Sequence, residues 1–99
     1  MNNFNTDNVQ RLVSEENVEL LKVMAHPVRL QIVSELAKSK TLNVTQLTDI
    51  LDIPQSTVSQ HLSKMRGKAL KAERKGLEMY YHIENSKADK IIQILGHAN

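Results

Sequence analysis

The sequence contains no cysteine, which excludes disulfides, thiolate metal sites and thiol-based redox sensing. Aromatic residues make up only 3% of the chain, so any core must be built mainly from aliphatic side chains and methionine. No apolar run approaches the roughly 18 residues of a membrane span, and the polar N-terminus lacks the features of a signal peptide. With 99 residues, we expect a single domain over 1–99 and a cytoplasmic location, without a membrane partner.

Positive charge is concentrated in one part of the chain. The net charge is +2, but residues 54–82 contain six basic and two acidic side chains. Residues 1–53 have an excess of acidic side chains, and residues 83–99 are balanced. A basic stretch on a mildly acidic body favours an anionic polymer as partner. A solvated surface that is basic by chance has the same composition, so charge alone leaves both interpretations open.

Apolar periodicity and capping residues predict four helices in the first two thirds of the chain. Ser14 followed by two glutamates is a helix-start signal. Pro27 can begin a second helix, whose wide apolar arc is typical of a central helix. A third helix opens at Asn43 with a variant of the capping box, and a fourth follows after a short connection, the spacing of a helix-turn-helix. Residues 1–13 are polar and are expected to form an irregular N-terminal extension.

The predicted fourth helix has two chemically different sides. At about 100° per residue, Val58, Leu62 and Met65 lie within about 60° of one another and face the core. The opposite side is rich in short polar groups, and no carboxylate occurs from Gln55 through Arg66. A solvated face usually mixes glutamate with lysine, whereas a face that reads base edges beside phosphates excludes acids. The predicted DNA-reading face consists of Gln55, Ser56, Thr57, Ser59, Gln60, Ser63 and Lys64.

Beyond the fourth helix, the apolar pattern changes from helical to alternating. Residues 70–83 alternate around a turn at Lys75 and Gly76, which predicts a β-hairpin with Arg74 and Lys75 near its tip. Asn85 caps a final helix. We therefore expect a mainly α fold with a small β-hairpin (α+β), a winged helix-turn-helix of five helices and a two-stranded wing.

The first and last helices carry broad apolar stripes. One small core is not expected to cover both, so we predict that they form the seam of a homodimer. The alternative is that they close the core of a single subunit. The residues expected at the seam are Leu12, Val13, Leu20, Leu21, Met24, Ile91, Ile92, Ile94 and Leu95.

Three segments resemble the ArsR/SmtB family of bacterial winged helix-turn-helix repressors. They read LLKVMAHPVRLQIVSEL (20–36), VTQLTDILDIPQSTVSQHLSKMR (44–66) and KGLEMYYHI (75–83), in the order and spacing of the family. The chain looks most like the PagR-type members, which act without a metal site. The resemblance implies a homodimer that places two reading helices in successive major grooves of a palindromic operator. It also implies that Arg74 and Lys75 of the wing approach the adjacent backbone or minor groove. The residues that the resemblance places against double-stranded DNA are Gln55, Ser56, Thr57, Ser59, Gln60 and Lys64.

The sequence departs from the metal-sensing members of this family. Those members carry Leu-Cys-Val-Cys where residues 42–45 read Leu-Asn-Val-Thr, and neither an amide nor a hydroxyl replaces a thiolate for soft metals. A second family site uses Asp and His on the last helix with a later His and Glu. Here Asp89 is followed only by His97, with no carboxylate after it. We expect no metal site and no cofactor.

Three further side chains need an explanation. His61 lies beside the core stripe of its helix and is expected to pack beneath it and donate a hydrogen bond, with a direct base contact as the alternative. His26 precedes a proline and is expected to hold a backbone group. Arg29 falls within the apolar arc of its helix. Its charge reaches either the helix end or a phosphate, or it pairs with an internal carboxylate.

These patterns predict a sequence-specific DNA-binding repressor that acts as a homodimer without metal or thiol sensing. The chain has no glycine-rich phosphate loop and no nucleophile–base pair, so we expect neither an enzyme nor a small-molecule substrate. The alternatives are a winged-helix protein-interaction module, or a regulator that responds to an unidentified ligand.

Overall fold

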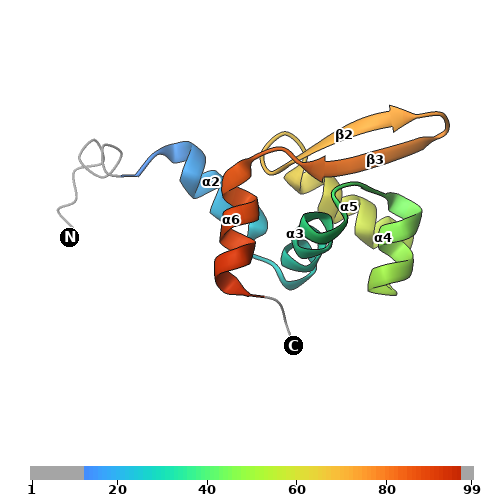
Figure 1. Ribbon diagram of the computed structural model, residues 1–99, viewed down its shortest axis with the longest axis horizontal. Helices are drawn as coiled ribbons and strands as arrows, with labels where there is room; N and C mark the ends of the chain where they lie inside the picture. The colour runs from blue at the N-terminus through green and yellow to red at the C-terminus, as the bar shows by residue number, and fades with distance from the viewer. Residues whose placement is uncertain (1–12, 97–99) are drawn as a thin grey trace.

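The computed structural model describes residues 13–96, which form five helices and a three-stranded antiparallel sheet (Figure 1). Residues 1–12 of the predicted extension, Leu12 among them, and His97 lie outside the described residues. The helices are α2 (Glu15–Met24), α3 (Pro27–Ser39), α4 (Val44–Leu51), α5 (Gln55–Met65) and α6 (Ser86–Leu95). The strands are β1 (Leu42–Asn43), β2 (Leu70–Lys75) and β3 (Glu78–Ile83).

The predicted helix starts are confirmed by their caps. At α4 the capping box is complete, because the Asn43 side chain accepts from the Gln46 amide and the Gln46 side chain accepts from the Asn43 amide, both at 2.8 Å. At α3, Nδ1 of His26 accepts a 3.1 Å hydrogen bond from the amide of Val28, which confirms its expected backbone-holding role. Side chains also cap α2 and α6, through Ser14 and Asn85 respectively.

The hairpin is confirmed, but its sheet has one strand more than the two-stranded wing that we predicted. Leu70 pairs with Ile83 and Lys75 with Glu78, so the turn is formed by Gly76 and Leu77, one residue later than the predicted Lys75 and Gly76. Gly76 adopts a φ of +65°, a conformation that glycine tolerates at little cost. The short β1 pairs with the edge of β3 that β2 leaves free, giving the order β1-β3-β2. Two residues are too few to show an alternating pattern, so the sequence did not reveal β1.

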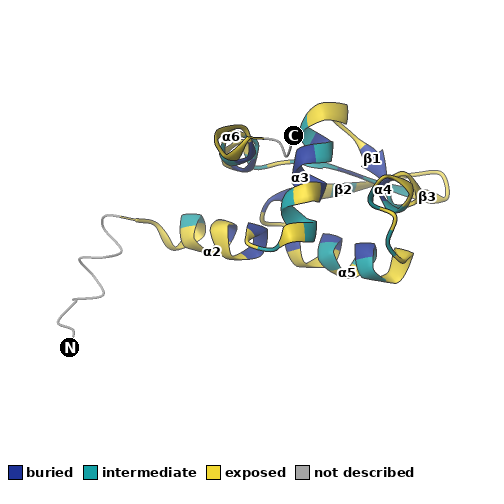
Figure 2. Cartoon of the chain, turned by 90° about the horizontal axis from the view of Figure 1, so that it is seen from below, coloured by how far each residue is buried: buried dark blue, intermediate teal, exposed yellow. Residues whose placement is uncertain are grey.

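The core is centred on α3, which lies between α5 and α6 (Figure 2). Ile32 and Val33 of α3 are fully buried, and Leu36 nearly so. Every other helix directs apolar side chains at this centre, as the predicted aliphatic core requires. The principal contributors are Leu20, Met24, Leu47, Val58, Leu62, Met65, Leu70, Ala88 and Ile92.

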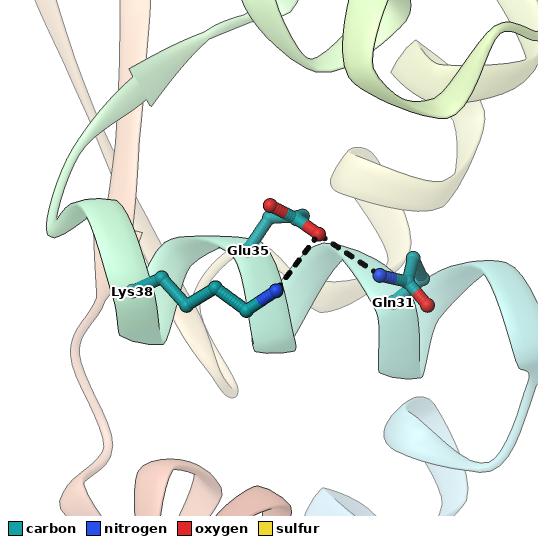
Figure 3. Close-up of polar contacts among 3 residues, drawn as sticks. All are labelled: Gln31, Glu35 and Lys38. Atoms are coloured by element: carbon teal, nitrogen blue, oxygen red, sulfur yellow. Dashed lines mark hydrogen bonds and ion pairs between the residues drawn. The ribbon is translucent and has the colours of Figure 1, made fainter. Parts of the chain in front are cut away.

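The carboxylate of Glu35, on the outer face of α3, is paired with side chains of the same helix (Figure 3). Glu35 accepts a 2.9 Å hydrogen bond from Nε2 of Gln31 and lies 3.5 Å from Nζ of Lys38. These partners are four and three residues away, the spacings at which side chains meet on a helix surface.

Within residues 13–96, no helix combines the length and apolarity needed to cross a membrane.

We predict that Asn43→Ala lowers the free energy of unfolding by about 1–2 kcal/mol, because it removes the cap that starts α4. Asn43 is buried and also pairs in the sheet with Tyr80. Ser14→Ala, which removes an exposed cap from α2, is the matched control and should cost less. Denaturant unfolding at one fixed protein concentration measures both. A loss in Asn43→Ala no larger than in Ser14→Ala would contradict the prediction.

Candidate nucleic-acid interface

The helix-turn-helix is formed by α4 and α5, joined by a tight turn at Asp52. This residue adopts a left-handed conformation (φ 55°, ψ 48°), and its amide donates a 2.8 Å hydrogen bond to the carbonyl of Thr48. Aspartate is one of the few non-glycine residues that often adopt this conformation. The turn ends α4 and allows α5 to pack against it.

One side of α5 is fixed by burial. Val58, Leu62 and Met65 are each 0% exposed, which confirms the predicted inward stripe. Because these three positions span the helix, α5 cannot rotate about its axis without exposing them to water. The opposite side of α5 is therefore turned outward.

The structure places the seven predicted reading residues on this one helix. None of these residues carries a negative charge, and no carboxylate interrupts the face between the ends of the helix. Thr57 and Ser59 are half-buried at its margins. The exposed members are Gln55, Ser56, Gln60, Ser63 and Lys64.

The wing extends beyond the helices as a paired hairpin (Figure 1). Arg74 and Lys75 are exposed near its tip. Nζ of Lys75 lies 5.3 Å from the centroid of the Tyr80 ring, a cation–π geometry that holds the ammonium against β3. Leu77, an apolar residue that no sequence pattern marked, is 96% exposed in the turn.

Basic side chains of α5 and of the start of α3 lie near one another. The ring of His61 is 4.4 Å from that of His26, centroid to centroid. Burial lowers the pKa of His61, and electrostatic interaction with His26, Arg29 and Lys64 lowers this pKa further. His61 is half-buried against His26, in agreement with the predicted packing on the inner flank of α5. The predicted hydrogen bond is absent at its Nδ1, which is buried without a partner among the described residues.

Arg29 has no carboxylate partner among residues 13–96, so within that part of the chain the alternative of an internal ion pair is not realised. Its Nε is buried and, within that part of the chain, has no hydrogen-bond partner. The residue as a whole is only half-buried. Arg29 lies in the first turn of α3, close enough to His61 to lower the pKa of that imidazole.

The predicted seam residues fall into two groups. Leu20, Met24 and Ile92 belong to the core of the subunit, and Ile91 is half-buried against it. The other predicted seam residues that the structure describes are exposed, on α2, on α6 or just before α2. Val18 of α2, which was not predicted to lie at the seam, is exposed as well. Nζ of Lys87, at the start of α6, donates a 2.7 Å hydrogen bond to Oδ1 of Asn17 in α2. Both helices are on the side of the molecule away from the wing tip (Figure 1). The exposed members are Val13, Leu21, Ile94 and Leu95.

Among the described residues, no group of three or more His, Asp or Glu side chains is arranged to hold a metal ion. The predicted absence of a site involving His97 lies partly outside this region.

A helix-turn-helix followed by a hairpin wing defines the class of winged helix-turn-helix transcription regulators. Residues 26–68 match the family described as bacterial regulatory protein, arsR family. The chain belongs to the ArsR family, as its sequence motifs predicted, and it is a non-enzymatic transcriptional repressor. DNA binding follows from membership of this helix-turn-helix family.

Individual relatives support the assignment. The transcriptional repressor PagR of Bacillus anthracis is 60% identical over 87 residues, which are 88% of each chain. The crystal structure of PagR has a TM-score of 0.82 and covers 87% of this chain and 99% of its own. The regulator YgaV of Escherichia coli is 36% identical over 83% of this chain and 84% of its own length. The structure of NolR from Sinorhizobium fredii is 29% identical, with a TM-score of 0.78 over 96% of this chain and 93% of its own.

The lowered pKa of His61 predicts a stability change in acid. A folded-state pKa below the unfolded value of 6.5 favours the neutral ring on folding. The stabilising contribution is therefore complete above pH 6.5 and is lost as the pH falls through the folded-state pKa. We expect denaturant unfolding to show this loss in the wild type and a smaller loss in His61→Gln.

His82→Gln, which removes a histidine from β3, is the matched control and should retain the wild-type change. An identical acid dependence of His61→Gln and the wild type would be inconsistent with this assignment.

Proposed function

We propose that the chain represses transcription as a homodimer on a palindromic operator, with α5 of each copy in successive major grooves. The observation that carries the proposal is the asymmetry of α5. Its inner stripe is completely buried, and its outer side presents polar and basic groups without a carboxylate. The two centres would lie about 34–36 Å apart, one turn of the duplex.

The exposed side chains of α5 suit two different contacts. Gln60 is exposed in the middle of the outer side, and a glutamine can bind the N6 and N7 edge of adenine with two hydrogen bonds. Ser56 and Ser63 flank it and can accept or donate to either base or phosphate. Lys64, at the margin, carries the charge that suits a phosphate. We assign base reading to Gln60 and its serine neighbours, and backbone contact to Lys64.

The wing supplies a second backbone contact in this proposal. Arg74 and Lys75 are exposed on a hairpin that reaches past the helical body (Figure 1). Their charges attract phosphates regardless of sequence, so the wing contributes affinity and register rather than discrimination.

The exposed apolar residues on and beside α2 and α6 support the homodimer. Leu21 is 51% exposed and Ile94 is 83% exposed, although both lie next to helical residues that form the core. Exposed apolar side chains are unfavourable in water, and a second copy of the chain can cover them with the same surface. We propose that the seam consists of Val13, Leu21, Ile94 and Leu95, with Val18 added.

We predict that Gln60→Ala and Lys75→Ala weaken DNA binding in different ways. Gln60→Ala should lose about 1–3 kcal/mol of discrimination between an operator and a random duplex, because it removes a base contact. Lys75→Ala should weaken both duplexes alike and reduce the salt dependence by about one charge. Fluorescence anisotropy measures both, with an operator selected from a random pool by the wild-type protein.

Gln31→Ala is the matched control, since it removes an exposed glutamine from α3 on the face drawn in Figure 3. An unchanged operator-to-random ratio in Gln60→Ala would show that the reading face is assigned wrongly. A wild-type protein that binds neither duplex at moderate salt would favour the protein-interaction module instead.

We predict that Leu21→Glu and Ile94→Glu each convert the dimer to monomers, because a carboxylate at the seam loses hydration without gaining a partner. Ile50→Glu is the matched control, since Ile50 is 46% exposed on α4, outside the proposed seam. Sedimentation velocity at micromolar concentration measures the mass. A monomeric wild type, or a dimeric Leu21→Glu and Ile94→Glu, would contradict the proposed seam.

A further inference from the structure

Four basic side chains, His26, Arg29, His61 and Lys64, lie together along one flank of α5, and we call them the basic cluster. Arg29 and His26 come from the first turn of α3 and its N-cap, and the other two come from α5. Two nitrogens of the cluster, Nε of Arg29 and Nδ1 of His61, are buried without a hydrogen-bond partner among the described residues. A buried polar nitrogen left without a partner costs free energy, and such a group calls for an explanation in a native structure.

The electrostatics of the basic cluster are one-sided. The side chains whose charge acts on His61 are His26, Arg29 and Lys64, and no carboxylate is among them. The other helices packed against α5 bury apolar side chains on their inner sides, namely Leu20, Val23 and Met24 of α2 and Leu47 of α4. The amino end of α3 adds the positive end of its dipole at the same place. The charges around His61 and this dipole end therefore favour a bound anion.

The basic cluster adjoins the reading face. Thr57, His61 and Lys64 are four and three residues apart, so they lie on one flank of α5, between the outer side and the buried stripe. Lys64 is itself exposed, and Arg29 and His61 are only half-buried, so an anion can reach the outer atoms of the basic cluster from solvent, with the two unpartnered nitrogens buried behind them. When the outer side of α5 enters a major groove, this flank lies against the phosphates that border the groove.

We propose that the basic cluster binds one phosphate of the DNA backbone beside the major groove, with Arg29 as the principal donor. The proposal rests on the DNA-binding role of α5 and adds a contact that the helix-turn-helix and the wing do not supply. A guanidinium suits this role because its donors match the geometry of phosphate oxygens, whereas lysine offers a point charge.

Phosphate binding at the basic cluster makes DNA affinity depend on pH. In the free protein, burial and the neighbouring cations lower the pKa of His61. A bound phosphate adds a negative charge to the same environment, which favours the protonated ring. Binding therefore takes up a proton at His61, and affinity rises as the pH falls toward and through the pKa of the bound state.

The first experiment measures binding of a random-sequence duplex by fluorescence anisotropy across a range of salt concentrations. Arg29→Gln should bind about tenfold more weakly than the wild type, as expected for one lost charge-assisted hydrogen bond. Its salt slope should also fall by about one phosphate contact. Arg29→Lys should restore part of the salt slope. Lys38→Gln is the matched control, because it removes an exposed cation from the same helix and should change little.

The second experiment follows the imidazole of His61 by NMR in the wild type, with and without the duplex. We expect the pKa of His61 to rise when the duplex is added, and we expect His61→Gln to flatten the pH dependence of affinity. This measurement needs no substitution at Arg29 and so does not depend on how that variant folds. An unchanged pKa on DNA binding, or an Arg29→Gln affinity equal to that of Lys38→Gln, would overturn the phosphate site.

The proposed operator function and the proposed phosphate site can be contradicted separately. If the wild type binds no duplex, the proposed operator function fails and the phosphate site fails with it. If the wild type binds but the Arg29 and His61 results are negative, only the phosphate site is wrong.

Discussion

The burial of the inner stripe of α5 is the constraint on which the rest of the structure depends. Val58, Leu62 and Met65 are completely excluded from water. Exposing one such side chain costs about 1.5–3 kcal/mol, so the rotation of α5 about its own axis is fixed within the subunit. Every polar residue on the opposite side of that helix obtains its outward direction from this packing. The reading face is thus a consequence of the core rather than of contacts among its own side chains.

The same core joins the helix-turn-helix to the wing. Asn43 caps α4 through its side chain and pairs with Tyr80 of β3 through its backbone. Leu70, where β2 begins, is fully buried, and Tyr81 of β3 lies in the same core. One short segment therefore fixes both the beginning of the helix-turn-helix and the edge of the sheet that carries the wing. This arrangement keeps the two elements that we propose to contact DNA in a constant relative position.

The basic cluster shows a different balance between stability and function. Cations and buried donors without partners are normally avoided in a folded domain. Here Arg29 and His61 are placed at the edge of the reading helix, next to the histidine that caps α3. The unfavourable electrostatics are local, and the surrounding aliphatic core supplies the stability that tolerates them. Departures from good local chemistry of this kind are expected at functional sites.

Much of this protein could be predicted from its sequence because the signals are local. Ser14, Asn43 and Asn85 mark helix starts, since a cap acts on amides only two or three residues away. The alternation over residues 70–83 gave the hairpin, and the stripe of α5 gave the side that faces inward. The absence of carboxylates from Gln55 to Arg66 identified the candidate reading face in the same way.

Features that depend on distant residues could not be predicted in this way. Strand β1 exists because Leu42 and Asn43 meet β3 across the fold, and two residues carry no period of their own. The contact between His26 and His61 joins residues 35 positions apart, so no spacing rule reveals it.

The division of the apolar stripes of α2 and α6 was likewise decided by packing. Leu20 and Ile92 turn inward, while Leu21 and Ile94 remain exposed. The sequence by itself determined the elements, their caps and the chemistry of each helix side, because these follow from neighbours along the chain. Only the tertiary structure decided which apolar groups α3 covers and which cations it brings together, because burial and electrostatic interaction depend on distance in space.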